Sequence, residues 1–217
     1  MQNPFIPGYR QLPSMLPIFP LSGAVVMPGA QLPLNIFEPR YLNLVQDVLG
    51  NHHLIGMIQP DDSEHSTKQQ LHTTGCAARI SFYNETLDGR IEIIITGVCR
   101  FDLQTELPSD RGYRLIKPNW RRFESDYDFN LPNTEDKRNS IYSCLDRYLA
   151  FNSLQTDTEQ LQKLTTPQLV NVLTTVLPLS HGDKQSILDA VSFDERSQLL
   201  MAKLEMASST DPNHLTH

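Results

Sequence analysis

Short apolar runs separated by turn residues dominate the first half of the chain. Three such runs, at 16–21, 24–27 and 32–37, are broken first by Ser22-Gly23 and then by Pro28-Gly29. Breaks of this kind are typical of short strands joined by sharp turns. Further strands are expected at 54–58, 74–83, 90–96, 98–107 and 113–120. The pattern therefore predicts a compact, barrel-like sheet of five or more strands.

One helix is expected within this strand-rich region. Pro39 suits the first turn of a helix, where its missing N–H has no partner to lose. Apolar residues recur at helical spacing from Tyr41 to Leu49, and Gly50 offers a stop. This part of the chain is therefore predicted to run as strand, turn, strand and helix.

Two connections in the same region differ in character. Asp88-Gly89 favours a tight hairpin, so the strands on either side of it are expected to be antiparallel. The segment 60–72 is polar and lacks periodicity, which predicts a loop. That loop is either a plain hairpin connection or a lid over a binding groove.

The pattern changes near Phe123. Positions 123–133 are acidic and aromatic, and helical periodicity, indicating four or five helices, prevails after them. The expected helix N-caps are Asn133 or Thr134, Thr166, Ser180 and Ser192. The predicted fold class is α+β, with a mostly antiparallel sheet domain at 12–124, a linker at 125–133, a helical bundle at 134–206 and a flexible tail at 207–217.

Composition and charge narrow the classes of function. The 217 residues are 39% hydrophobic and 20% charged, as in ordinary soluble proteins, and the net charge of -7 argues against a general polyanion binder. No apolar run approaches the roughly 20 residues that cross a bilayer, and the N-terminus does not resemble a secretory signal. Three cysteines without CxxC spacing suit a reducing compartment. We therefore expect a cytoplasmic protein that does not contact a membrane.

Several segments carry a resemblance to a known family. LPIFPL at 16–21, a Pro-Gly turn and LPLNIFEPRY at 32–41 resemble the N-terminal substrate-binding domain of Lon proteases, in the short stand-alone form found in bacteria. GCAARI at 75–80, GRIEIIITGVCRF at 89–101 and LPLSHGDKQ at 177–185 resemble later parts of the same domain. The resemblance implies a PUA-like pseudo-barrel with an embedded helix, followed by a C-terminal helical bundle. It also implies a non-catalytic module that binds unfolded or extended polypeptide, as an adaptor in protein quality control or with a protease partner.

Motifs for catalysis are missing from the sequence. A complete Lon protease adds an ATPase module and a peptidase module with a Ser-Lys pair, but the sequence contains no GxxxxGK[ST], GxSxG or HExxH. A thiol hydrolase using Cys76, Cys99 or Cys144 with a histidine is the remaining enzymatic alternative. Each cysteine lies among apolar residues, where cysteine usually packs as a small hydrophobe. His52-His53 has no third ligand nearby, so we predict no metal and no cofactor.

The first candidate binding surface is the segment from Asn35 to Tyr41. Phe37 and Tyr41 offer apolar area, while Glu38 and Arg40 could pair with polar groups of a bound chain. An unpaired strand edge beside them could take up an extended peptide by adding it to the sheet. In the alternative interpretation, both aromatic residues belong to the core and Glu38 with Arg40 forms a structural ion pair or a cap.

The second candidate surface is a basic and aromatic cluster of Lys117, Trp120, Arg121 and Arg122. An indole beside guanidinium groups suits single-stranded nucleic acid or an acidic peptide. Because the Lon N-terminal fold is similar to PUA modules, an RNA-binding protein is the alternative function. The acidic run at 124–128 and the overall charge argue against nucleic acid. A solvated strand end closed by local salt bridges is the structural alternative.

Overall fold

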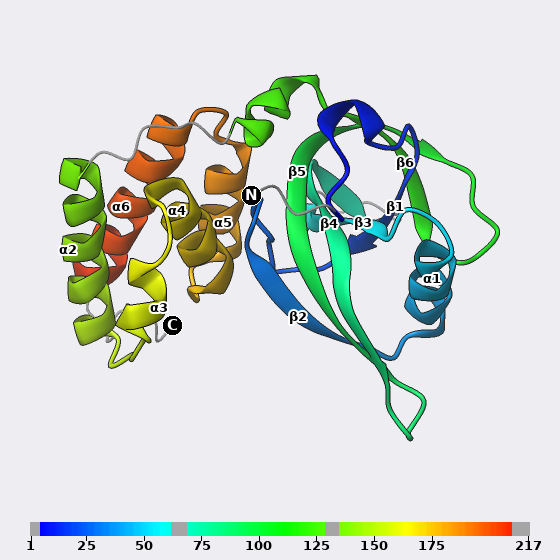
Figure 1. The fold of residues 1–217 in the computed structure, drawn as a ribbon, viewed down its shortest axis with the longest axis horizontal. Helices are drawn as coiled ribbons and strands as arrows, with labels where there is room; N and C mark the ends of the chain where they lie inside the picture. The colour runs from blue at the N-terminus through cyan, green and yellow to red at the C-terminus, as the bar shows by residue number, and fades with distance from the viewer. Residues whose placement is uncertain (1–4, 62–68, 129–134, 210–217) are drawn as a thin grey trace.

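The structure is a computed structural model that describes residues 5–61, 69–128 and 135–209. It has a sheet half and a helical half that lie side by side (Figure 1). The sheet half contains η1 (Tyr9–Gln11), β1 (Leu16–Pro20), β2 (Gln31–Ile36), α1 (Pro39–Leu49), β3 (Leu54–Asp61), β4 (Gln70–Glu85), β5 (Ile91–Leu107), β6 (Arg114–Asn119) and η2 (Arg121–Tyr127). The helical half contains α2 (Glu135–Phe151), α3 (Thr158–Gln162), α4 (Thr166–Val176), α5 (His181–Asp189) and α6 (Phe193–Ser209).

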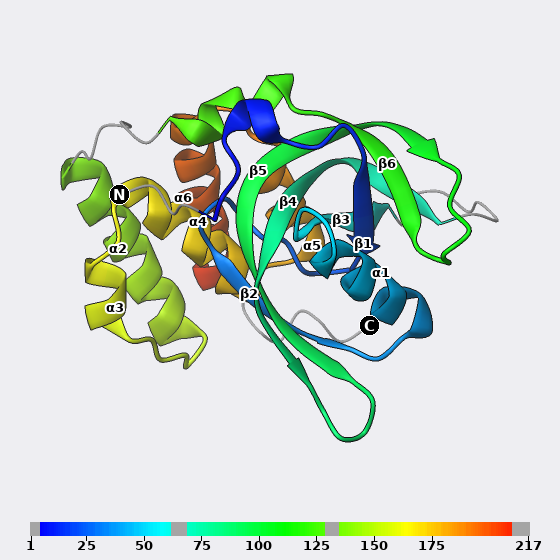
Figure 2. The same cartoon turned by 45° about the vertical axis from the view of Figure 1, so that its right-hand side comes forward.

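The sheet closes into a ring because β5 has two different partners on one side. Its first half pairs with β2 and its second half pairs with β6, while β4 pairs with β5 along both halves. The strand order β2-β5-β4-β3-β1-β6, with the extra pairing of β5 and β6, makes the barrel visible in Figure 2. Among the six strands of the described residues, β1 and β3 form the one parallel pair. The predicted α+β class and mostly antiparallel barrel are therefore confirmed.

The two longest strands differ from the predicted ones. The runs expected at 90–96 and 98–107 form one strand of 17 residues that passes through Gly97 without a break. Together with β4 it projects from the barrel as a long hairpin that ends at the expected Asp88-Gly89 turn (Figure 1). Gly97 has no room for a side chain, since an added Cβ would lie 2.1 Å from the carbonyl oxygen of Met27.

The strand predicted at 24–27 is wrong. Residues 24–27 are not part of a strand, and the next residue, Pro28, forms an isolated bridge with Gly97. Its backbone is held by the helical half instead: the Met27 N–H donates to Thr175 Oγ1 at 3.1 Å, and Asn171 Nδ2 donates to the Pro28 carbonyl at 2.9 Å. Helix side chains therefore take the place of a neighbouring strand.

The helix within the sheet half follows the sequence closely. Pro39 stands in the first turn of α1, Glu38 precedes it, and Gly50 ends it. The buried face carries Tyr41, Leu44, Val45 and Val48 into the main apolar core of the barrel.

The helix caps were predicted with one error. The N-cap of α4 is Thr165 and not Thr166, because the Thr165 hydroxyl accepts from the Gln168 N–H and Gln168 bonds back to it. The caps at Ser180 and Ser192 are as expected, with acceptor distances of 3.1 Å each. The alternatives Asn133 and Thr134 lie outside the described residues. Two element ends overlap the expected linker and tail, since η2 runs to Tyr127 and α6 runs to Ser209.

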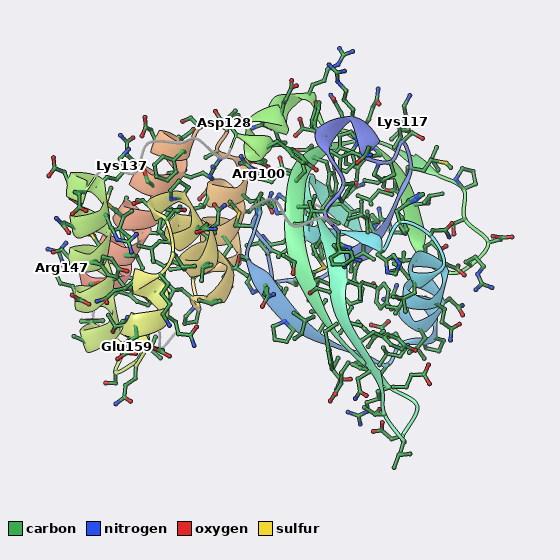
Figure 3. All side chains as sticks on the ribbon, in the orientation of Figure 1. Arg100, Lys117, Asp128, Lys137, Arg147 and Glu159 are labelled. Atoms are coloured by element: carbon green, nitrogen blue, oxygen red, sulfur yellow. The ribbon has the colours of Figure 1, made fainter. Side chains whose placement is uncertain are left out.

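The two halves meet at a polar seam, which we define as the contact of α4, α5 and the turn after α5 with the sheet. At its centre lies Arg100, which is fully buried and whose position is labelled in Figure 3. Its guanidinium donates to both carboxylate oxygens of Asp126 and to the carbonyl oxygens of Leu188, Ala190 and Val191. One side chain therefore joins the barrel wall, η2 and the end of α5.

Candidate functional site

A three-stranded region of the sheet extends beyond the barrel (Figure 1). We call it the arm and define it as β2 with segments 80–85 of β4 and 91–96 of β5. Its inner face carries buried residues such as Ile91, Ile93 and Ile95, which belong to the core. Its outer face is exposed to solvent, so any binding by the arm must use that face.

An apolar row crosses the outer face. Pro33 lies opposite Ile94, and Ile94 lies opposite Phe82. Phe82 is 50% exposed although it is a large aromatic side chain. A groove of about 350 Å³ follows this row, lined by Pro33, Leu34, Asn35, Phe82, Glu92, Ile93 and Ile94. We call it the arm groove.

Polar residues flank the apolar row on both sides. Towards the tip, Asn35 lies opposite Glu92 and Glu92 opposite Asn84, whose amide donates to the Glu92 carboxylate at 3.1 Å. On the barrel side, the Thr96 hydroxyl bonds to the Ser81 hydroxyl at 3.0 Å. An apolar centre with a polar rim is the composition expected of a binding surface.

Two more apolar side chains extend this surface. Phe37, which directly follows β2, is 64% exposed. Leu87 stands at the tip of the hairpin and is fully exposed. Large apolar side chains left in water along one projecting element indicate contact with another molecule.

The free edge of the arm is only partly able to pair with a strand. Within the described residues β2 pairs with β5 alone. Pro33 lies in the middle of β2 and has no N–H, and a proline within a sheet turns its nitrogen away from the ladder. A peptide added to this edge would therefore miss one hydrogen bond. The arm groove offers side-chain contacts that do not depend on that bond.

The structure divides the first predicted site. Asn35 lies on the arm and the exposed Phe37 directly follows it, whereas Tyr41 is 5% exposed and lies in the core with its ring 4.1 Å from that of Phe19. Burial raises the pKa of Tyr41. Arg40 lies over the Tyr41 ring at 4.5 Å and forms an ion pair with Glu38 at 2.8 Å.

The residues of the second predicted site do not form one open surface. Trp120 is half-buried, donates its indole N–H to the Pro13 carbonyl at 3.1 Å and packs edge-on against Phe101. Arg122 pairs with Asp102 at 3.1 Å and donates to the Asp189 carbonyl in the helical half. Lys117 and Arg121 are exposed, and Lys117 lies far from the helical half in Figure 3.

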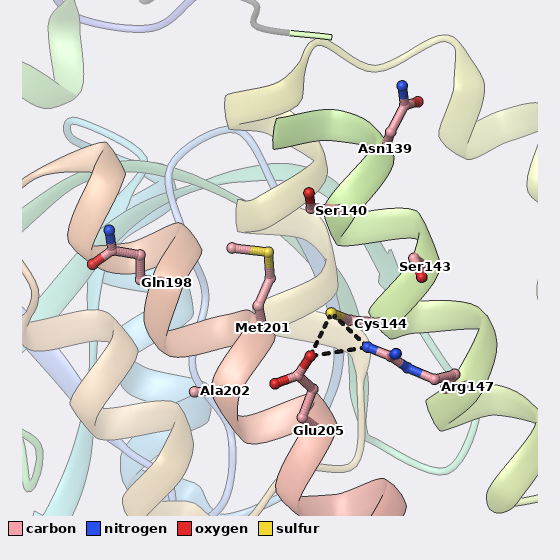
Figure 4. A pocket seen from close by; sticks show the side chains of 9 residues that line it. All are labelled: Asn139, Ser140, Ser143, Cys144, Arg147, Gln198, Met201, Ala202 and Glu205. Carbon is pink, nitrogen blue, oxygen red and sulfur yellow. Dashed lines mark hydrogen bonds and ion pairs between the residues drawn. The ribbon is translucent and has the colours of Figure 1, made fainter. Parts of the chain in front are cut away.

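The three cysteines lack the features of a nucleophile. All are buried, and burial raises the pKa of Cys76, Cys99 and Cys144. Cys144 lies at a second hollow of about 600 Å³ between α2 and α6, where Arg147 and Glu205 form an ion pair beside the sulfur (Figure 4). A thiol with a raised pKa carries little thiolate near neutral pH. The described residues also contain no cluster of three or more potential metal ligands.

Sequence reasoning missed most of the residues that line the arm groove. Phe82, Ile94 and Pro33 come from three different strands, so only the register brings them together. One signal was available: Ile94 shares a face with Arg90 and Glu92, so an apolar side chain stands on an otherwise polar face.

No helix in the described part of the chain is long and apolar enough to span a bilayer.

Comparison with known proteins identifies relatives of the whole chain. Residues 15–205 match the family described as the ATP-dependent protease La (LON) substrate-binding domain. Lon protease 1 of Hydrogenovibrio crunogenus is 24% identical over 196 residues, which cover 87% of this chain and 23% of that protein. Lon protease of Flavobacterium johnsoniae is 29% identical over 106 residues, which cover 48% of this chain and 13% of that protein. The chain thus spans about a quarter or less of these relatives.

Two solved structures share the fold. A Lon N-terminal domain protein from Xanthomonas campestris superposes with a TM-score of 0.61 at 23% identity, covering 87% of this chain and 97% of that one. The N-terminal domain of Lon protease from the Mycobacterium avium complex gives a TM-score of 0.60 at 13% identity, covering 88% and 98%.

Proposed function

The chain belongs to the family of LON substrate-binding domains, and on that premise we propose that it binds unfolded or extended polypeptide in the arm groove. The observation that carries the proposal is the exposed apolar row of Pro33, Ile94 and Phe82 on a strand region that projects from the barrel. The matched family is a substrate-binding and not a catalytic part of Lon, which agrees with the absence of catalytic motifs in this sequence.

The chemistry of the groove suits a polypeptide in extended conformation. Its apolar row accepts an aliphatic or aromatic side chain, and the amides of Asn35 and Asn84 can bond to the backbone of a bound chain. Folded proteins bury such side chains, whereas unfolded ones expose them. A groove of this size holds one or two side chains, so we propose weak, general capture rather than recognition of a long sequence.

The other candidate functions have less support. RNA binding through Trp120 would need a free stacking face, yet its indole is anchored to Pro13 and its ring lies against Phe101. Arg122, the arginine that would assist Trp120, already forms an ion pair with Asp102 and donates to the Asp189 carbonyl at the end of α5. A cysteine hydrolase would need an ionised thiol, which burial opposes at Cys76 and Cys99.

We further propose that the protein acts in protein quality control in the cytoplasm, presenting captured chains to a Lon-type protease as an adaptor. The basis is the family membership together with the relatives, which are Lon proteases. Adding the protein to a purified bacterial Lon protease should speed the degradation of an unfolded substrate. An unchanged degradation rate would contradict the adaptor role and leave polypeptide binding intact.

Binding itself is tested by fluorescence anisotropy with a labelled extended dodecapeptide that has a Phe-Leu-Phe centre flanked by serines. Replacing Phe82 by Ser should weaken binding about fivefold, because losing half of a phenylalanine's burial costs about 1 kcal/mol. The matched control is Phe151→Ser, which removes a phenylalanine of similar exposure from the end of α2.

Salt separates this function from RNA binding. Peptide capture by apolar contact should persist at high salt, whereas phosphate contacts weaken steeply with added salt. Equal loss of binding in Phe82→Ser and Phe151→Ser would remove the arm groove as the site. A salt-sensitive response to single-stranded RNA, without any response to the peptide, would favour the PUA-like alternative.

A further inference from the structure

The arm carries a charge pattern that the apolar row does not explain. From Glu85 to Glu92 the hairpin contains three acidic residues and one basic residue, a net charge of -2. The charges do not cancel at the groove, because Arg90 forms its ion pair with Asp88 at the tip, at 3.0 Å. The carboxylate of Glu85 accepts from the Tyr83 hydroxyl beside it.

Glu92 is the carboxylate that lines the arm groove. Its contact within the described residues is the Asn84 amide at 3.1 Å, and no ion pair is found for it there. It is exposed and lies on the outer face in the row next to the apolar row. An amide satisfies one carboxylate oxygen with a neutral donor, so the negative charge stays available to a ligand cation.

The spacing of the rows fixes where that cation would lie on a bound chain. Ile94 and Glu92 are two residues apart on β5, a separation of about 7 Å along a strand. An extended peptide that runs along the arm also turns every second side chain to the same face. A side chain two positions from the one held by the apolar row therefore comes next to Glu92.

We propose that the arm groove selects extended segments in which an aromatic or aliphatic residue is followed or preceded, two positions away, by lysine or arginine. This inference rests on the proposed function, since it names the substrate class of the same groove. The apolar side chain lies over Phe82 and Ile94, and the cation pairs with Glu92. The acidic hairpin repels acidic segments and phosphate groups from the same surface.

The test uses four labelled peptides that share one central phenylalanine in a serine background. In the first, lysines stand two positions from the phenylalanine on each side; in the second they stand one position away, where they face away from the arm. The third has glutamates two positions from the phenylalanine. The fourth keeps the phenylalanine and has serine at every other position. At low salt the first should bind about threefold to fivefold tighter than the serine peptide, and the glutamate peptide should bind weakest. High salt should remove most of this difference.

Variants of Glu92 assign the preference to one carboxylate. Glu92→Gln keeps a hydrogen-bonding group beside Asn84 and should abolish the advantage of lysine, while Glu92→Lys should reverse the order of the lysine and glutamate peptides. The matched control is Glu159→Lys, which changes the net charge equally at an exposed position on α3, far from the arm in Figure 3. It should leave the order unchanged.

The outcomes separate this inference from the proposed function. If the serine peptide binds and the four affinities are equal, or if Glu92→Lys keeps the original order, the charge selection is wrong and peptide capture stands. If lysine helps equally at one and at two positions, general charge attraction explains the result and the register is wrong. If none of the peptides binds, both proposals fail.

Discussion

Replacement of Arg100 by methionine should be among the most destabilising single changes in the barrel wall. The guanidinium is fully buried and pairs with an Asp126 carboxylate that is 2% exposed. Methionine fills a similar volume but leaves the carboxylate without its cation, which costs about 3–5 kcal/mol for a buried pair. It also leaves the carbonyl oxygens of Leu188 and Ala190 without this donor, at about 1–3 kcal/mol each when no water replaces it, whereas the Val191 carbonyl keeps its bond from Arg196.

These losses are not additive, since water can enter a disrupted seam. We therefore expect Arg100→Met to lower the free energy of unfolding by at least about 4 kcal/mol, a large part of the roughly 5–15 kcal/mol typical of a folded protein. Adding Asp126→Asn should recover about 1–3 kcal/mol, because the asparagine removes the unpaired charge and its oxygen still accepts from the backbone N–H of position 100.

Urea unfolding followed by two signals measures the effect. Fluorescence of Trp120, the single tryptophan, reports on the barrel, and far-ultraviolet circular dichroism reports mainly on the helices. The control is Arg147→Met, whose ion pair with Glu205 is more than half exposed on both sides and should contribute less than about 1 kcal/mol. If Arg100→Met were no more destabilising than Arg147→Met, our account of the seam would be wrong.

Three further predictions concern other parts of the molecule. Gly97→Ala should destabilise by about 1–3 kcal/mol in urea unfolding, because the new Cβ meets a backbone oxygen at 2.1 Å; Gly182→Ala, in the first turn of α5 with nothing within 4 Å, should be neutral or stabilising. Burial lowers the pKa of Lys184, so the unfolded chain binds more protons at this residue and the contribution of Lys184 to stability should rise with pH from below 10.5 up to that value; the difference in unfolding free energy between the wild type and Lys184→Met should show this rise, because the buried cysteines and tyrosines, whose raised pKa values act in the opposite direction, are common to both. Cys76 and Cys99 should resist alkylation until the protein unfolds, and rapid labelling of either in native buffer would contradict their burial.

Local patterns in the sequence were enough for the elements and most of their ends. Pro39 and Gly50 mark α1 correctly, and the serine caps of α5 and α6 were found because a cap depends on residues within one turn. The strand at 24–27 failed for the opposite reason: its backbone partner is Thr175, some 148 residues away, and no local pattern contains that contact.

The arm groove was harder to predict because it depends on register. A β-bulge between Ile80 and Phe82 shifts the alternation of β4, so that both Ser81 and Phe82 are exposed. A strict alternation would have buried one of them. The position of Tyr41 was also not predictable from local spacing, because helical spacing fits both a core residue and a surface aromatic residue. Its packing against Phe19 shows that it belongs to the core.

The proline in the middle of β2 has a consequence for how copies of this protein behave towards one another. A module that exposes apolar side chains beside an unpaired strand edge is at risk of adding its own copies edge to edge and growing into fibres. Pro33 removes a donor from that edge, so a second β2 cannot complete a ladder against it. The exposed apolar side chains of the arm therefore lie beside an edge that disfavours the growth of fibres from copies of this chain.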